Sequence, residues 1–78
     1  MEHQDFISKF AAQFEETDIS EFQINTEFRD LDEWTSFIAL YLMAMVEEEY
    51  EVILKADDIR KSKTIEDLFN IVQSKIKT

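Results

Sequence analysis

Apolar residues recur at helical spacing near the start of the chain. Phe6, Phe10 and Phe14 are four residues apart, and Ile7 lies beside them. In a helix these side chains form one apolar stripe, because residues three and four apart share a face. The pattern predicts an amphipathic helix over residues 4–16.

A second amphipathic helix is predicted near the C-terminus. Thr64 and Asp67 have the spacing of a capping box, in which two side chains satisfy the free amides of a first helical turn. Lys75 and Lys77 would lie near the negative end of this helix. Its apolar face would consist of Ile65, Leu68, Phe69, Val72 and Ile76.

The middle of the chain predicts a helix of a different kind, over residues 36–50. Thr35 is a suitable N-cap, because its hydroxyl can accept a hydrogen bond from a free amide of the first turn. Residues 37–46 are apolar without interruption, and Glu47, Glu48 and Glu49 follow them. Such a helix is buried on all sides or keeps an apolar face for a partner, and burial on every side is hard to arrange in 78 residues.

Two connections and a short helix complete the predicted order. Residues 51–55 form the second connection, and Asp57 or Asp58 would cap a helix of one or two turns through Ile59 and Arg60. The fold class is all-α: a four-helix bundle of three main helices and one short helix, in a single domain over residues 1–78. The first connection, residues 17–35, is expected to be an ordered loop fastened by Phe22, Ile24, Phe28, Leu31 and Trp34.

Composition excludes several kinds of site. Without cysteine there is no disulfide, and without glycine there is no glycine-rich phosphate loop. The only histidine, His3, is near a terminus, so no metal site is expected. The longest apolar run has ten residues where a membrane span needs about 18, and the polar start does not resemble a signal peptide. A cytoplasmic protein is therefore expected.

The charge of −10 is distributed unevenly along the chain. Residues 1–36 carry a net −8, residues 37–58 a net −5 and residues 59–78 a net +3. The first two thirds would repel nucleic acids and anionic membranes, and would attract basic protein surfaces. No acid–base pair with a nucleophile can be assembled, so the chain is not expected to be an enzyme.

Several segments together resemble the acyl carrier protein family, over essentially the whole chain. They are residues 30–37, the apolar helix ending in the acids 47–49 and Tyr50, residues 56–60 and residues 64–68. Members of that family carry Asp-Ser-Leu or a near variant at the start of their second helix. Here Thr35 stands in place of the Asp and Phe37 in place of the Leu.

The resemblance implies a stand-alone carrier whose Ser36 bears a covalent 4′-phosphopantetheine arm. The arm would hold acyl groups, of fatty acid or polyketide type, as thioesters, and its thiol belongs to the prosthetic group. The partners would be a phosphopantetheinyl transferase and acyl-transferring or acyl-activating enzymes with basic docking surfaces, and the carrier would be a monomer. The implied docking residues are Asp30, Asp32, Glu33, Thr35, Phe37, Leu40, Tyr41, Ala44, Glu47 and Glu48.

Other interpretations of the same residues stay open. A serine at a helix start is ordinarily part of the cap, Glu47–Glu49 would also suit a solvated helix end, and the stripe from Phe37 to Ala44 would also suit a core. An aminoacyl, peptidyl or D-alanyl carrier would share the fold and the arm. An unmodified helical adaptor would use the apolar helix and its acidic rim without any arm.

Overall fold

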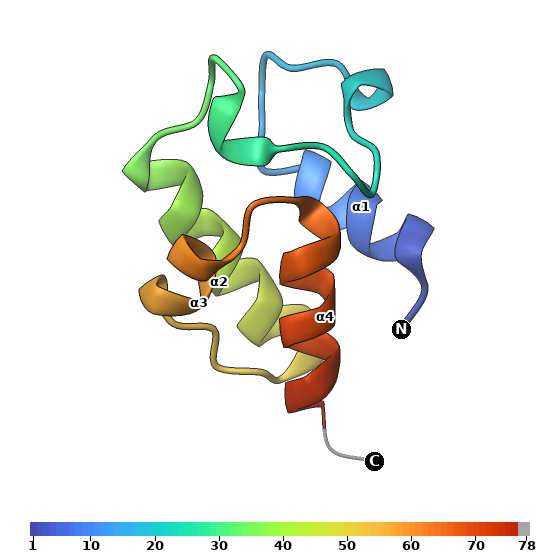
Figure 1. Ribbon diagram of the computed structural model, residues 1–78, viewed down its shortest axis with the longest axis vertical. Helices are drawn as coiled ribbons and strands as arrows, with labels where there is room; N and C mark the ends of the chain where they lie inside the picture. The colour runs from blue at the N-terminus through green and yellow to red at the C-terminus, as the bar shows by residue number, and fades with distance from the viewer. Residues whose placement is uncertain (77–78) are drawn as a thin grey trace.

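The computed structural model describes residues 1–76, and every regular element in this range is helical (Figure 1). The predicted all-α class is therefore confirmed, with four helices that form a small bundle. A long connection crosses one end of this bundle, and within it lie two short 3₁₀ turns (Figure 1). The elements are α1 (His3–Ala11), η1 (Ile19–Glu21), η2 (Phe28–Asp30), α2 (Ser36–Tyr50), α3 (Ala56–Lys61) and α4 (Ile65–Lys75).

Helix α1 is shorter than predicted, because it ends at Ala11 and not near residue 16. The amides of Glu15 and Glu16 donate to the Glu33 carboxylate, at 2.7 and 3.0 Å, and so do not continue the helical ladder. Phe14 stays buried nonetheless, and its ring lies 4.9 Å from that of Phe22 in the connection. A tertiary contact has replaced the last helical turn.

Helix α2 runs over residues 36–50, as predicted. The Thr35 hydroxyl accepts a hydrogen bond from the Ile38 amide at 3.3 Å, which confirms the N-cap. At the other end Glu51 adopts the left-handed conformation, with φ of 56°, and its amide donates to the Glu47 carbonyl at 3.0 Å. A residue in this conformation ends a helix.

The connection before α2 is ordered, and its five predicted anchors pack against the core. Phe22 and Phe28 are buried, while Trp34 is half-buried with its ring 5.1 Å from that of Phe28. Two backbone carbonyls of this segment, of Ile24 and Thr26, accept hydrogen bonds from the first amides of α4 at 2.8 and 3.1 Å. The connection thus completes the start of α4.

The predicted cap of α3 is wrong. Lys55 occupies the N-cap position, and Asp58 lies in the first turn, where its carboxylate accepts a hydrogen bond from the Lys55 amide at 2.9 Å. The acid still satisfies a free amide, but it does so from inside the helix. Lys75, at the end of α4, forms an ion pair with Asp58 at 3.3 Å.

The capping box of α4 is confirmed. The Thr64 hydroxyl accepts a hydrogen bond from the Asp67 amide at 3.2 Å, and the Asp67 carboxylate accepts one from the Thr64 amide at 3.1 Å. The predicted apolar face is buried except for Ile76, which is partly buried. Lys77, the second lysine expected near this end, lies outside the described residues.

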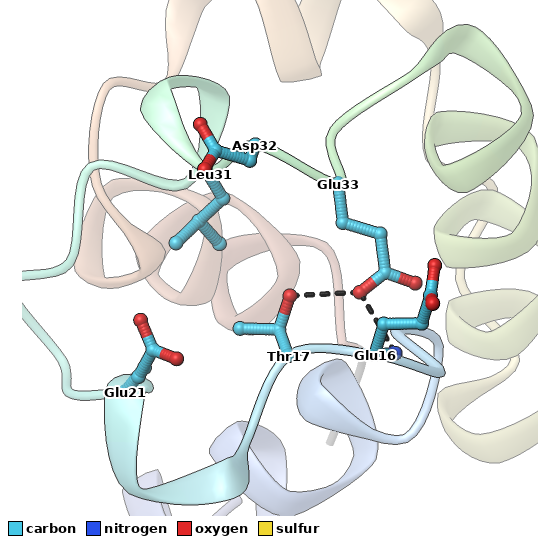
Figure 2. A pocket seen from close by; sticks show the side chains of 6 residues that line it. All are labelled: Glu16, Thr17, Glu21, Leu31, Asp32 and Glu33. Atoms are coloured by element: carbon cyan, nitrogen blue, oxygen red, sulfur yellow. Dashed lines mark hydrogen bonds between the residues drawn. The ribbon is translucent and has the colours of Figure 1, made fainter.

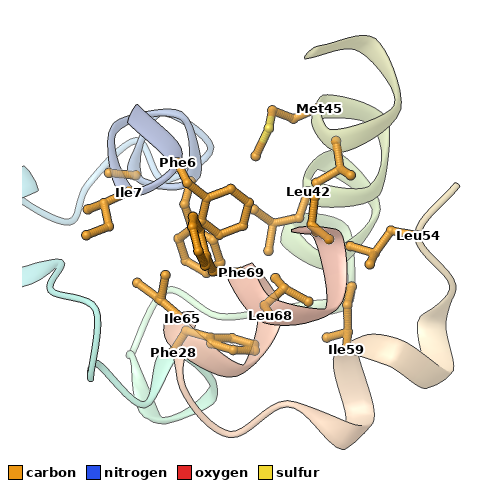
Figure 3. Packing of buried hydrophobic residues seen from close by; sticks show 14 of the residues in the cluster. Phe6, Ile7, Phe28, Leu42, Met45, Leu54, Ile59, Ile65, Leu68 and Phe69 are labelled. Carbon is orange, nitrogen blue, oxygen red and sulfur yellow. The ribbon is translucent and has the colours of Figure 1, made fainter. Parts of the chain in front are cut away.

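Side chains from all four helices and from the long connection meet in one core (Figure 3). Phe6 of α1, Leu42 of α2, Ile59 of α3 and Leu68 of α4 are buried in it, together with Phe28 of the connection. No helix within residues 1–76 is long and apolar enough to cross a membrane. The core uses only one face of α2, and this leaves the other face available.

Candidate functional site

Helix α2 has two apolar faces with different surroundings. The inward face contributes Ile38, Leu42, Met45 and Val46 to the core. The outward face is exposed: Phe37 retains 67%, Leu40 56% and Tyr41 53% of its accessible surface, and Ala44 is exposed beside them. Large apolar side chains gathered on one exposed face are typical of an interaction surface. These residues do not belong to the core of this chain.

Ser36 is the first residue of α2, at the edge of the exposed apolar face, and it is itself exposed. Its hydroxyl makes no hydrogen bond within residues 1–76, and the backbone amides of Ser36 and Phe37 have no acceptor there either. A substituent on this oxygen would therefore break no existing bond. A negatively charged substituent would lie near two free N–H groups and the positive end of a fifteen-residue helix.

The Ser36 position fits a phosphodiester-linked arm on these grounds. A substituent on the neighbouring Thr35 oxygen would disturb the hydrogen bond that this oxygen accepts from the Ile38 amide to cap the helix. The shallow hollow beside Thr35 and Phe37 is lined by no basic side chain. The Ser36 hydroxyl has no hydrogen-bond acceptor within residues 1–76 that could take its proton, so a separate enzyme would have to supply the chemistry of attachment.

Four of the predicted docking acids are exposed and free. Asp30 and Asp32 precede α2, whereas Glu47 and Glu48 continue its outward face beyond Ala44 at helical spacing. None of the four forms an ion pair within residues 1–76. Their neighbour Glu49 differs, because Lys9 of α1 lies 3.4 Å from its carboxylate. Acids without an ion pair in this range thus lie before the exposed face and at its far end, and of these Asp30 shares a hollow with Arg29 and Lys63.

Glu33 lies in a different environment from the other predicted acids. It is half-buried, and its two oxygens accept hydrogen bonds from the Glu15 amide at 2.7 Å, the Glu16 amide at 3.0 Å and the Thr17 hydroxyl at 2.7 Å. Figure 2 shows the bonds from Glu16 and Thr17. The Thr17 hydroxyl and the two amides stabilise the carboxylate and lower the pKa of Glu33. This carboxylate binds the protein's own backbone.

Metal chemistry has no support in the described part of the chain. Within residues 1–76 no group of three or more His, Asp or Glu side chains is placed to hold a metal ion. His3 stacks on the ring of Phe69 at 4.1 Å, on α4.

The predicted helix start at Ser36 and the predicted cap at Thr35 are confirmed, whereas the sequence does not predict the three hydrogen bonds of Glu33. The donors to Glu33 come from residues 16 to 18 positions earlier in the chain, so no local spacing reveals them. No protein-family model matches this chain, and no curated protein matches its sequence.

Proposed function

We propose that this protein is an acyl carrier protein that bears a 4′-phosphopantetheine arm on Ser36. One observation carries the proposal: an exposed serine, whose hydroxyl makes no hydrogen bond within residues 1–76, begins a fifteen-residue helix whose outward apolar face is not used by the core. Phe37, Leu40 and Tyr41 are large apolar side chains exposed within the first two turns of α2. A helix with a purely structural role in a chain of 78 residues has no need of such a surface.

The residues around Ser36 would divide the work of a carrier. Ser36 supplies the attachment oxygen, Thr35 holds the helix start in place, and the free amides of the first turn stabilise the phosphodiester charge. The arm, when bound, supplies the thiol that carries the acyl group as a thioester. The protein itself presents the cargo and performs no step on it.

The outward face of α2 would contact the enzymes that load and use the arm. Phe37, Leu40 and Tyr41 offer apolar area beside the attachment point. Glu47 and Glu48, free of ion pairs among the described residues, would steer basic enzyme surfaces toward that area. Charge of this kind acts mainly on the association rate and on the choice of partner. Aminoacyl, peptidyl and D-alanyl carriers would use the same arrangement.

A second candidate is an unmodified helical adaptor. One feature favours it: Phe37, the aromatic residue directly after the serine, has about two thirds of its surface exposed. An aromatic anchor of this kind suits a permanent protein interface. In that case the face of α2 would be covered by a partner and Ser36 would remain a plain helix-start residue.

Intact mass spectrometry distinguishes the two candidates. We expect the chain, incubated with a phosphopantetheinyl transferase and coenzyme A, to gain the mass of one phosphopantetheine. Ser36→Ala should remain at the unmodified mass, and its free energy of unfolding should change by less than about 0.5 kcal/mol, because the side chain is exposed and Thr35 still caps α2. Ser20→Ala, which removes an exposed serine from η1, is the matched control and should be modified like the parent.

Two results would contradict the proposal in different ways. A parent chain that stays unmodified with several transferases would exclude the carrier and leave the adaptor. Modification that persists in Ser36→Ala would place the arm on another hydroxyl. Ser62 is a poor alternative, because it is fully buried and its hydroxyl donates to the Asp58 carbonyl at 2.9 Å.

A further inference from the structure

The Glu33 carboxylate joins two segments that are far apart in the sequence. Its hydrogen-bond donors belong to residues 15–17, which follow α1, and Figure 2 shows two of them, Glu16 and Thr17. Glu33 itself lies three residues before Ser36. All three distances are between 2.7 and 3.0 Å, the range of good charge-assisted hydrogen bonds. One side chain therefore fixes the end of α1 against the approach to α2.

The next residue, Trp34, is also held in place. The Trp34 amide donates to the Leu31 carbonyl at 3.0 Å, and the Trp34 ring packs 5.1 Å from Phe28 and 6.4 Å from Phe14. The backbone that leads into Ser36 thus has a polar attachment at Glu33 and an aromatic one at Trp34. Thr35 follows directly and caps α2. Of residues 32–34, only Glu33 and Trp34 make hydrogen bonds within the described part of the chain, so these two attachments hold this stretch in place.

We infer that Glu33 is a positioning residue that fixes the backbone from which Ser36 presents its hydroxyl. The inference rests on the proposed function for the chemistry at Ser36, but its structural part does not. An enzyme that modifies an exposed hydroxyl gains rate when that hydroxyl is held in one place, and a displacement of about 1 Å can cost roughly 100-fold. We call the three hydrogen bonds of the Glu33 carboxylate the Glu33 clamp. Without this clamp, Ser36 would sample more orientations and would react more slowly.

Glu33 and its neighbour Asp32 have different expected roles, because only Glu33 forms the clamp. Asp32 is exposed and has no ion pair within residues 1–76, so its charge faces solvent and any incoming partner. Loss of the Asp32 charge should weaken docking, which raises KM. Loss of the Glu33 clamp should lower kcat, because it affects the placement of the reacting oxygen after docking.

The test compares three variants of the full chain. Glu33→Gln removes the charge and turns an N–H toward a backbone N–H. Thr17→Val removes one donor and leaves the Glu33 charge in place. Asp32→Asn removes an adjacent charge without breaking a hydrogen bond. Each is measured by NMR amide exchange, with Val46 in the buried part of α2 as the reference amide, and by steady-state attachment of phosphopantetheine.

We expect the Glu15 and Glu16 amides of Glu33→Gln to exchange about tenfold faster relative to Val46, because each loses a charged acceptor. The Ile38 amide, which reports the cap of α2, should also exchange faster. We expect kcat to fall roughly tenfold in Glu33→Gln and by a smaller factor in Thr17→Val, with KM nearly unchanged. Asp32→Asn should leave the amides and kcat as in the parent.

Unchanged exchange at Glu15 and Glu16 in Glu33→Gln would overturn the clamp. Faster exchange there, with Ile38 exchange and kcat both at the parent values, would overturn the positioning role. If no transferase modifies the parent, the proposed function fails, and the Ile38 amide alone decides whether Glu33 positions the start of α2. A kcat loss in Glu33→Gln that Thr17→Val does not share would also contradict the inference.

Discussion

Two leucines on the same helix provide the sharpest test of the exposed face of α2. Leu42 is fully buried in the core (Figure 3), whereas Leu40 keeps 56% of its surface accessible. Leu42→Ala should cost about 2–5 kcal/mol, through lost burial and the cavity left behind. Leu40→Ala should change stability by less than about 0.5 kcal/mol, because the site is exposed and alanine is a good helix former.

The size of the domain makes this difference easy to measure. At roughly 0.05–0.15 kcal/mol per residue, a chain of 78 residues has about 4–12 kcal/mol of stability. A loss of about 3 kcal/mol, with an m value of about 1–3 kcal/mol/M, lowers the urea midpoint by at least about 1 M. Leu42→Ala should therefore unfold at much lower urea than the parent, and Leu40→Ala at nearly the same concentration.

Far-UV circular dichroism and the fluorescence of Trp34, the only tryptophan, provide two probes of the transition. Coincident curves would justify two-state treatment. Leu40→Ala should instead raise KM for the transferase, which Leu42→Ala should not do while it remains folded. Equal losses of stability in the two variants would refute the reasoning, since Leu40 would then be buried in solution.

The remaining predictions concern the backbone and the charges. Glu51→Gly should stabilise the protein by about 0.5–1 kcal/mol in the same urea assay, because Glu51 has φ of 56°, and Glu51→Ala, which keeps the Cβ, should not. Raising ionic strength from very low to physiological should raise Tm by screening the net charge of −10, and a Tm that is constant or falls would contradict this. Hydrogen bonds lower the pKa values of Glu33, Asp58 and Asp67, so their contribution to stability is complete above the ordinary carboxylate pKa and is lost as pH falls through the lowered values. Acid titration of Asp67→Asn should show a smaller loss below about pH 4 than that of the parent.

The parts of the fold that sequence reasoning predicted depend on local interactions. Thr35 caps α2 and Thr64 caps α4 through contacts three residues away, and such contacts have a recognisable spacing. The prediction for the end of α1 is wrong: the Gln13 and Phe14 amides donate to carbonyls three residues back, and the next two amides donate to Glu33, which is remote in sequence. Asp58 is predicted as a possible N-cap of α3, but it lies in the first turn and accepts a hydrogen bond from the amide of the N-cap residue, Lys55. Sequence alone does not separate these two positions, because either can satisfy a free amide of the first turn.

The candidate site shows the same division. The apolar run in α2 is compatible with burial on all sides or with an exposed face, and the structure decides between them, because Phe37, Leu40 and Tyr41 are exposed while the opposite side of the helix is buried. The sequence could not separate Asp32, whose carboxylate is free among the described residues, from Glu33, whose carboxylate is bonded to three donors. That difference arises because the fold brings residues 15–17 next to Glu33, which is 16 to 18 positions later in the chain.

The long connection also has a consequence for how the molecule opens. Its carbonyls at Ile24 and Thr26 accept hydrogen bonds from the first amides of α4, and Phe22 and Phe28 are buried beneath it. Detaching this segment would expose two aromatic side chains and leave the amides of Ile65 and Glu66 without acceptors. A segment held by buried aromatic side chains and by hydrogen bonds to a helix start unfolds together with the rest of the molecule and not before it. Proteases should therefore cut it no faster than they cut the bundle, although most of it lies outside regular helix.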